Sequence, residues 1–189
     1  MACMLVANDL RLVNGRTVSL TADRGVPLAI MGASGSGKSL MLRALADLDP
    51  APGDVSLDGT SREAMPAPCW RSRVCYVQAE AGWWEETVAD HLSRPHLPLA
   101  DRLHLDPARL TAPRRELSSG ERARAALLRA LLAEPDALLL DEPTGPLDPD
   151  TTLAVEAVLR DWAQTRVLVF STHDVGQPDR LGAHVMHLT

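Results

Sequence analysis

Residues 32–39 read Gly32-Ala33-Ser34-Gly35-Ser36-Gly37-Lys38-Ser39, which follows the pattern G-x-x-x-x-G-K-[ST]. Glycines let such a loop curl so that successive backbone N–H groups converge on phosphate oxygens. Lys38 is the only lysine among the 19 basic residues, which indicates that this position needs a compact ammonium group. We therefore predict that the loop binds a nucleotide, with Lys38 at the β- and γ-phosphates and the Ser39 hydroxyl on Mg²⁺.

The residues on either side of this loop are typical of a strand followed by a helix. Val26–Met31 is a short apolar run suited to a buried strand, and Ser39–Ala46 has a helical composition. A helix that begins at the loop adds the positive end of its dipole to the phosphate site. Asp49–Gly53, with two prolines and a glycine, ends this unit.

Size, charge and cysteine content narrow the class of protein. A chain of 189 residues with 46% hydrophobic content suits one nucleotide-binding domain, and its net charge of −6 argues against a nucleic-acid surface. No apolar run approaches the length of a membrane span, and Met1–Ala7 lacks the basic start of a signal peptide. Cys3, Cys69 and Cys75 lack paired C-x₂-C spacing, so we expect reduced thiols in a cytoplasmic protein.

Short apolar runs predict the remaining elements. Ahead of the loop, the expected strands are Met4–Ala7, Leu10–Val13 and Arg16–Thr21. After it, the expected strands are Asp54–Leu57, Val74–Val77, Ala137–Leu140, Val167–Ser171 and Ala183–Leu188. Ser119–Ala133 and Thr151–Gln164 are expected as helices, and Thr60–Trp70 as a loop.

These elements define a fold class. Prolines break residues 80–116 into helical segments, and we interpret residues 79–133, approximately, as a small helical insertion. Elsewhere apolar strands alternate with helices, which is typical of a mostly parallel sheet flanked by helices. The predicted fold is an α/β P-loop NTPase with an N-terminal antiparallel β part, as a single domain over residues 1–189.

Two carboxylates follow the apolar run that begins at Ala137. Asp141 comes at the carboxyl end of a predicted parallel strand, where ligands of such sheets bind, and can hold Mg²⁺ through water. Glu142 is then placed to orient or deprotonate an attacking water. Asp-Glu-Pro is also common in solvated turns after strands, but the presence of the phosphate loop favours the functional interpretation.

Leu117–Glu121 reads Leu-Ser-Ser-Gly-Glu at the start of a predicted helix. The simplest interpretation is a capping box, in which Ser118 caps the helix and Glu121 reaches back to it. A capping box does not require Gly120, which is a poor helix former. These backbone N–H groups are therefore candidates for a second role.

In combination, these motifs make the chain resemble the ATP-binding cassette (ABC) ATPases over nearly its whole length. Motifs similar to those of the family occur in the family's order. They are Gly32–Ser39 (Walker A), Gln78 (Q-loop), Leu117–Glu121 (signature), Asp141–Glu142 (Walker B and catalytic glutamate), Gly145–Asp148 (D-loop) and Ser171–Asp174 (switch histidine His173). The signature together with His173 is the most specific part of the resemblance.

The resemblance implies a mechanism. Two copies pair head to tail, so that each ATP is held by Walker A of one copy and by the signature of the other. The implied ATP-binding residues are Gly32, Ser34, Gly35, Ser36, Gly37, Lys38, Ser39, Leu40, Ser118 and Gly120. The implied catalytic residues are Glu142, His173 and Gln78, and the implied Mg²⁺ ligands are Ser39, Gln78 and Asp141.

The resemblance also implies partners. The leading hypothesis is the ATPase subunit of a transporter, paired with a second copy and with a separately encoded transmembrane permease, on the cytosolic face of the cell membrane. No nucleic-acid partner is expected. A soluble ABC ATPase that acts as a clamp in assembly or repair is the main alternative. A nucleotide-binding scaffold that scarcely turns over is a third, although the presence of Lys38, Asp141, Glu142 and His173 counts against it.

Two features depart from the family pattern: the position of the adenine-stacking residue and the signature. Val13 stands where the family usually stacks an aromatic ring on adenine, and residues 1–69 contain no Trp, Tyr or Phe. Since that stacking is worth about 1–3 kcal/mol in comparable contacts, we predict weak discrimination between bases. The signature has Ser119 where glycine is usual and Glu121 where glutamine is common. Ser119 either slows closure of the pair or points to solvent.

Trp83 and Trp84 are adjacent in a chain with four tryptophans. In transporters of the family, this neighbourhood after the Q-loop receives a helix from the membrane subunit. The two rings are either buried anchors or an exposed docking patch, and the sequence leaves both interpretations open.

Overall fold

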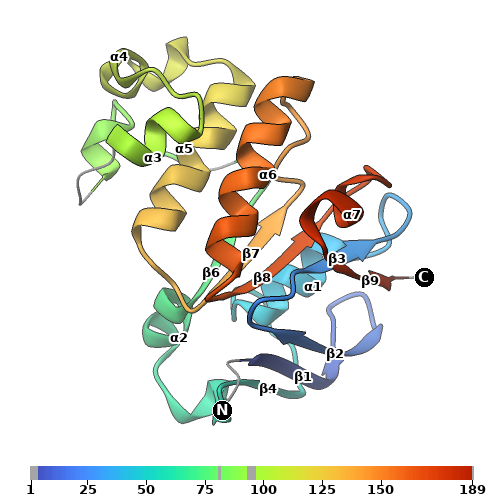
Figure 1. Cartoon of the computed structure of the whole chain (residues 1–189). Helices are drawn as coiled ribbons and strands as arrows, with labels where there is room; N and C mark the ends of the chain where they lie inside the picture. Colours follow the sequence, from blue (N-terminus) through green and yellow to red (C-terminus); the bar gives the residue numbers. More distant parts are fainter. Residues whose placement is uncertain (1–3, 81, 93–96, 189) are drawn as a thin grey trace.

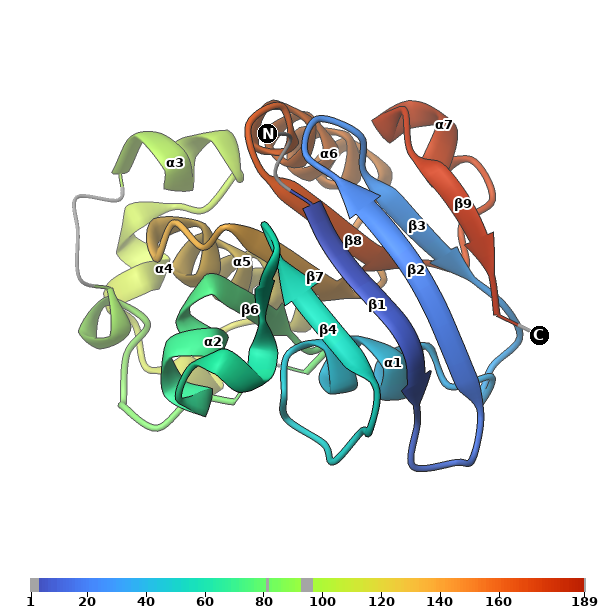
Figure 2. The ribbon, with the colours of Figure 1, turned by 90° about the horizontal axis from the view of Figure 1, so that it is seen from below.

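Two β-sheets with the helix α1 (Lys38–Leu45) between them form the centre of the molecule (Figures 1 and 2). The computed structural model describes residues 4–80, 82–92 and 97–188, so Cys3 lies outside the described residues. Met41, Leu42 and Leu45 of α1 are fully buried in one core cluster with side chains of both sheets. The packing of both sheets against α1 fixes the position of the loop that precedes it.

The smaller sheet is antiparallel, with the strand order β2-β1-β4-β5. Its strands are β1 (Met4–Arg11), β2 (Thr17–Asp23), β4 (Asp54–Leu57) and β5 (Thr60–Ser61). The prediction of two strands at Met4–Ala7 and Leu10–Val13 was wrong, because β1 runs without a break from Met4 through Leu10 and ends at Arg11. The register with β2 shifts between Ala7 and Leu10, and Asp9 has a φ of 49°. This bulge accommodates the polar Asn8–Asp9 pair without ending the strand.

The predicted loop Thr60–Trp70 is also incorrect, since it contains β5 and most of the helix α2 (Ala67–Arg73). Pro68 lies in the first turn of α2, where a proline's fixed φ suits a helix start. Trp70 is fully buried, and its Nε1 donates a 2.9 Å hydrogen bond to the carbonyl of Leu45. Burial of this ring against the end of α1 anchors a segment whose composition suggests a loop.

The larger sheet is parallel, with the strand order β6-β7-β8-β3-β9. Its strands are β6 (Val74–Val77), β7 (Ala137–Asp141), β8 (Val167–Ser171), β3 (Leu28–Met31) and β9 (His184–His187). Along β7, Leu139 faces the cluster around α1, whereas Leu138 and Leu140 face a second cluster. That second cluster includes α5 (Ser119–Leu132) and α6 (Pro149–Ala163). The sheet is therefore covered on both faces, which confirms the predicted fold class.

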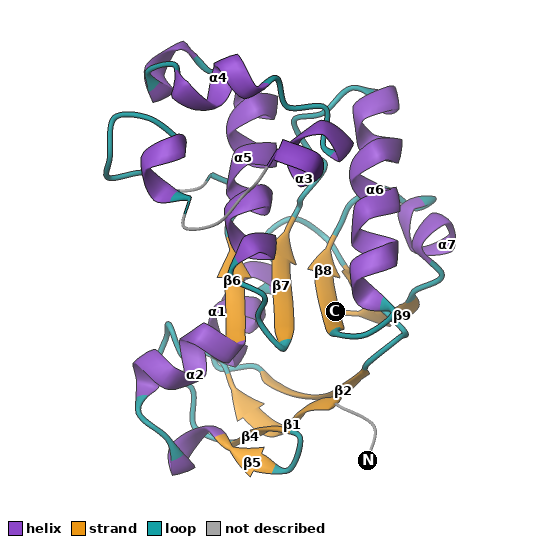
Figure 3. Cartoon of the chain, turned by 60° about the vertical axis from the view of Figure 1, so that its left-hand side comes forward, coloured by secondary structure: helices purple, strands orange, loops and turns teal. Residues whose placement is uncertain are grey.

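Short helices fill the region between β6 and β7. They are α3 (Leu97–Arg102) and α4 (Pro107–Thr111), which lie beside α5 at the end of the molecule away from the antiparallel sheet (Figure 3). Leu103 and Leu110 are fully buried there, in the same cluster as Leu128 of α5. The last helix, α7 (Gln177–Leu181), packs on α6. Over the described ranges, no helix is both long enough and apolar enough to cross a membrane.

Candidate nucleotide-binding and catalytic site

The predicted phosphate loop joins β3 to α1. A close backbone contact requires glycine at position 32, and the backbone conformation favours glycine at position 37. A Cβ at Gly32 would lie 2.4 Å from the carbonyl oxygen of Leu188, and a Cβ at Gly37 would lie 2.9 Å from Nδ2 of Asn14. Gly37 also has a φ of 101°, in the left-handed region that side chains disfavour. The tight curl expected of a phosphate loop is therefore present in the folded chain.

Polar groups gather inside this loop. The Nζ of Lys38 donates to the carbonyl oxygens of Gly32 (2.9 Å) and Ala33 (3.1 Å), and the lysine is only 6% exposed. The Oγ of Ser36 is buried without a hydrogen-bond partner among the described residues. An ammonium group and an unpaired hydroxyl group at the start of a helix suit a phosphate group.

The other predicted residues of the loop are more accessible. Ser34, Gly35 and Ser39 are exposed, and Leu40 lies half-buried in the first turn of α1. The Ser39 hydroxyl is therefore accessible at the N-terminal turn of the helix, next to Lys38.

Asp141 ends β7 as a buried carboxylate held by two hydroxyl groups. The Oγ of Ser171 donates to Oδ1 over 2.6 Å, and the hydroxyl group of Tyr76 donates to Oδ2 over 3.2 Å. Burial and the adjacent Asp141 carboxylate raise the pKa of Tyr76, which keeps its hydroxyl group a donor. The two donors come from β8 and β6, on either side of β7, and orient the carboxylate. Sequence patterns gave no signal for the role of Tyr76.

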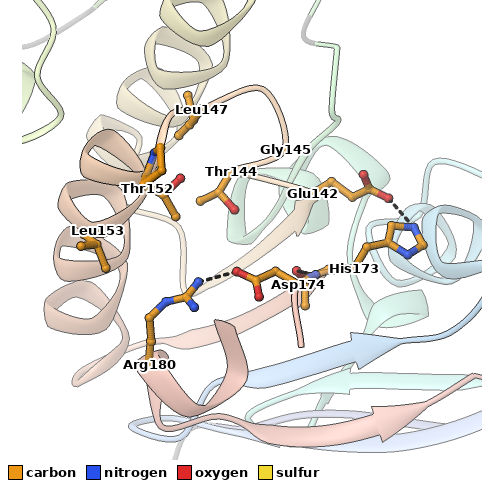
Figure 4. Close-up of a pocket in the computed structure, with 11 residues that line it drawn as sticks. Glu142, Thr144, Gly145, Leu147, Thr152, Leu153, His173, Asp174 and Arg180 are labelled. Atoms are coloured by element: carbon orange, nitrogen blue, oxygen red, sulfur yellow. Dashed lines mark hydrogen bonds and ion pairs between the residues drawn. The ribbon is translucent and has the colours of Figure 1, made fainter. Parts of the chain in front are cut away.

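Glu142 and His173 lie together at the same edge of the sheet. Nε2 of His173 is 3.0 Å from Oε1 of Glu142, and both side chains are partly exposed. Glu142 has a φ of 49°, an uncommon conformation for a residue with a side chain, and its N–H donates to Oγ of Ser171. The pair borders a cavity of about 430 Å³ (Figure 4). The structure therefore brings these two predicted catalytic residues into direct contact.

Gln78 is exposed immediately after β6. It lines a small cavity together with Asp141 and Glu142. It also lines a larger groove of about 510 Å³ that extends to Trp84. Gln78 therefore lies between the carboxylates and this groove.

Ser118 and Gly120 begin α5 with the predicted capping box. Oγ of Ser118 accepts from the N–H of Glu121 (3.1 Å), and Oε2 of Glu121 accepts from the N–H of Ser118 (2.7 Å). The guanidinium group of Arg109 donates to Glu121 at 2.8 Å, and this contact lowers the pKa of Glu121 to about 2. This second partner of Glu121 is a residue that sequence reasoning missed.

Close packing explains why position 120 is a glycine, which the capping box does not. A Cβ at this position would lie 3.2 Å from the carbonyl oxygen of Pro146 and 3.3 Å from Leu147. The start of α5 thus packs tightly against the loop that follows Glu142. Ser119 is exposed and borders a cavity that Glu142 also lines, so its side chain points outward.

The two halves of the predicted ATP site do not meet within one chain. α1 packs in the cluster on one face of the parallel sheet, and α5 packs in the cluster on the other face. Among the described residues, no hydrogen bond joins Ser118 or Gly120 to residues 32–39. Ser118 and Gly120 therefore lie at the start of a helix that packs on the opposite face of the sheet from α1.

Of the two adjacent tryptophans, Trp84 lines the groove beside Gln78. Trp84 is 71% exposed, whereas Trp83 is partly buried. The guanidinium carbon of Arg129 lies 4.5 Å from the centre of the Trp83 ring and 5.1 Å from that of Trp84. Nε2 of His91 accepts from the N–H groups of Trp84 and Glu85, so its Nδ1 carries the proton and faces the carbonyl of Thr87. The structure therefore separates the two rings, one anchored and one open to solvent.

Comparisons with known proteins identify the family of this chain. A family model described as ABC transporter matches residues 16–145. Protein STAR1 of Oryza sativa subsp. japonica is 39% identical over 184 residues, which cover 88% of this chain and 52% of that protein. The nickel import ATP-binding protein NikO of Rhodobacter capsulatus is 36% identical over 197 residues, which cover 90% of this chain and 78% of that protein.

A solved structure has the same fold. It is a dimeric ATP-binding cassette in a post-hydrolysis state, bound to ADP and Pi. The alignment has a TM-score of 0.85 at 22% identity and covers 98% of this chain and 94% of that chain.

The chain belongs to the ABC transporter family. The fold and the site define its class, an ATP-hydrolysing cassette of the kind that serves as the ATP-binding subunit of a transporter. These findings confirm the predicted family, fold class and type of enzyme. The chain spans about half the length of STAR1 and a larger part of NikO.

Proposed function

We propose that two copies of this chain close head to tail around two ATP molecules and Mg²⁺, and that hydrolysis drives a separate membrane subunit. The single observation that carries this proposal is the placement of the phosphate loop and of Ser118 on helices at opposite faces of one sheet. A γ-phosphate held at Lys38 is then reached by the Ser118 hydroxyl and the Gly120 N–H of a second copy. ATP thereby joins the two copies.

In this proposal the loop of one copy binds the phosphates. The loop groups are the backbone and side chains of Gly32, Ser34, Gly35, Ser36, Gly37, Lys38, Ser39 and Leu40. Two observations support a phosphate group at this position. The Ser36 hydroxyl is buried without a hydrogen-bond partner among the described residues, and a Cβ at Gly32 would lie 2.9 Å from that hydroxyl oxygen. When ATP binds, the Nζ of Lys38 leaves the loop carbonyl oxygens and donates to phosphate oxygens instead.

Three of the predicted residues suit Mg²⁺. The accessible Ser39 hydroxyl, the oriented Asp141 carboxylate and the Gln78 side chain are all oxygen donors, which this cation prefers. When bound, Mg²⁺ neutralises charge on the β- and γ-phosphate oxygens. Among the described residues, no group of three or more His, Cys, Asp or Glu side chains is arranged to hold a metal ion.

Hydrolysis then uses the pair at the sheet edge. Glu142 accepts a proton from water as the water oxygen bonds to the γ-phosphorus and the bond to the β–γ bridging oxygen breaks, which yields ADP and phosphate. His173, 3.0 Å from Glu142, orients this carboxylate. Gln78 is the third catalytic residue in this proposal, and it lies between the two carboxylates and the groove that Trp84 lines.

The deciding experiment is Glu142→Gln, which keeps the shape of the side chain and removes its ability to accept the proton. With ATP and Mg²⁺, we expect this variant to elute as a long-lived dimer in size-exclusion chromatography with light scattering. Adding Lys38→Ala to it should restore the monomer, because the phosphates are no longer held. A Glu142→Gln protein that stays monomeric at saturating ATP would refute the head-to-tail mechanism.

The groove between Gln78 and Trp84 is proposed to receive a helix of the membrane subunit, on the cytosolic face of the membrane. Its exposed Trp84 ring and Leu48 side chain are apolar anchors, and Gln78 connects it to the carboxylates. Trp84→Ala should release the protein from the membrane fraction of cells. Val185→Ala, an exposed apolar residue on the strand at the opposite sheet edge, is the matched control. A wild-type protein that never cofractionates with membranes would favour a soluble ABC clamp instead.

A further inference from the structure

Glu156 is a carboxylate in the interior of α6, only 2% exposed. Arg180 of α7 holds both of its oxygens, with Nε at 2.7 Å from Oε2 and Nη2 at 2.7 Å from Oε1. Gln177 Nε2 donates to Oε1 as well, over 3.0 Å. A buried charge with this many donors is well satisfied, yet such pairs add little net stability over apolar residues. The Glu156–Arg180 pair therefore needs an explanation other than stability.

The same arginine reaches the switch loop. Nη2 of Arg180 donates to Oδ2 of Asp174 over 2.6 Å, and Asp174 directly follows His173 (Figure 4). Oδ1 of Asp174 accepts from the N–H of Gly176, so both of its oxygens are engaged. Contact with Arg180 is the main reason that the pKa of Asp174 lies below its ordinary value. The loop that carries His173 is thereby connected to Glu156 through one guanidinium group.

A second connection reaches the loop that carries Glu142. Gln177 is fully buried, and its Nε2 donates to Oγ1 of Thr144 over 2.9 Å in addition to Glu156. Thr144 belongs to the turn that the hydrogen bond from Gly145 N–H to the Glu142 carbonyl closes. One buried carboxylate therefore lies behind both catalytic loops.

We propose that Glu156 and Arg180 are positioning residues for ATP hydrolysis. Through Asp174 on one side, and through Gln177 and Thr144 on the other, they hold His173 and Glu142 at the spacing of 3.0 Å. Both catalytic side chains are partly exposed, so their own burial does not hold them in place. The buried Glu156–Arg180 pair, which is connected to both loops, restricts how far Glu142 and His173 can move apart. This inference rests on the proposed roles of Glu142 and His173.

The test variant is the double substitution Glu156→Gln and Arg180→Gln. It removes both charges together, because removing only Arg180 would leave an unpaired buried carboxylate and could unfold the chain. We expect kcat for ATP to fall about 10- to 100-fold, since misplacement of reacting groups has costs of this size. The KM for ATP and the Kd for ATP in calorimetry should change less than about threefold, because the phosphate loop is untouched.

The matched control is another ion pair that includes a residue of α6. Nη2 of Arg102, the last residue of α3, lies 2.5 Å from Oδ2 of Asp161 in α6, and both side chains are exposed. Arg102→Gln together with Asp161→Asn should leave kcat within about twofold of the wild type. Arg180→Lys, which keeps the positive charge, should give a kcat between those of the wild type and the double Gln variant.

Two outcomes would overturn the inference. The first is a double Gln variant with the wild-type melting temperature and a kcat within twofold of the wild type. The second is a variant whose kcat, KM and melting temperature all change together, which indicates a general structural role. Glu142→Gln is assayed in parallel. If it retains turnover, the proposed function fails; if it is inactive while the double Gln variant is fully active, only this inference fails.

Discussion

Nε2 of His173 lies 3.0 Å from Oε1 of Glu142, although the two residues belong to different loops. They meet because β7 and β8 are neighbouring parallel strands whose last residues, Asp141 and Ser171, pair in register. The loops that follow therefore emerge at the same edge of the sheet. Strand register thus places a carboxylate and an imidazole at the same sheet edge, where parallel sheets bind their ligands.

Replacement of His173 by alanine is expected to lower kcat for ATP about 100-fold or more, because Glu142 loses the group that orients it. The Kd for ATP should stay within about threefold, since Lys38 and the loop are unchanged. Steady-state ATPase assays and calorimetry measure the two effects, with the exposed His184→Ala as the control. A normal kcat with a raised KM would instead indicate that His173 contributes only to binding.

Lys38 is expected to tolerate neither alanine nor arginine. Its Nζ lies within the loop, 2.9 Å from the Gly32 carbonyl, where a planar guanidinium group does not fit. Both variants should bind a fluorescent ATP analogue at least about 30-fold more weakly than the wild type in equilibrium titration. Arg24→Lys, at an exposed turn, controls for charge exchange elsewhere. Binding by Lys38→Arg within threefold of the wild type would contradict this prediction.

Two tryptophans should respond differently to truncation. Trp84 is 71% exposed, so Trp84→Ala should change the free energy of unfolding by no more than about 0.5 kcal/mol. Trp70 is fully buried and bonds to the Leu45 carbonyl, so Trp70→Ala should lose about 3–5 kcal/mol. Urea denaturation of both variants measures the difference. Equal losses would show that Trp84 is part of the core.

Base selectivity is expected to be weak. Val13 is 60% exposed, and the sequence has no aromatic residue before Trp70 to stack on adenine. We predict that kcat/KM for GTP lies within about tenfold of that for ATP, and Val13→Tyr should raise the preference for ATP. A preference of the wild type for ATP of a hundredfold or more would rule out this interpretation.

The Arg109–Glu121 contact at the start of α5 should stabilise the folded chain less at acidic pH. In the folded chain, Arg109 lowers the pKa of Glu121 to about 2, whereas the ordinary value is 4.5. Because the folded-state pKa is depressed, this stabilisation is complete above about pH 5 and is lost as the pH falls towards 2. Arg109→Gln should therefore lower the free energy of unfolding at pH 7, and should lower it less at pH 3.

Urea unfolding at pH 7, 4 and 3 measures this trend. In a Glu121→Gln background, the effect of Arg109→Gln should not vary over the same range, because the titrating carboxylate is absent. A cost of Arg109→Gln that is equal at pH 7 and pH 3 in the wild-type background would contradict the assigned partner.

Local sequence was sufficient to predict the local geometry of several segments of the candidate site. The phosphate loop, Asp141 and the capping box at Ser118 each depend on residues within a few positions of one another, and short motifs encode such arrangements directly. Alternation of apolar strands with helices predicted the parallel sheet in the same way. Where a distant contact overrode local composition, as for Trp70 in α2, the prediction was wrong.

The contacts of the catalytic edge required the folded chain. Tyr76 and Ser171 become donors to Asp141 only because β6 and β8 flank β7, and no periodicity in the sequence reports that order. Glu156 and Arg180 likewise form a pair only once α7 packs on α6. Hydrogen bonds and ion pairs act over a few ångströms in space, so groups far apart along the chain acquire their partners when the sheet and its helices assemble.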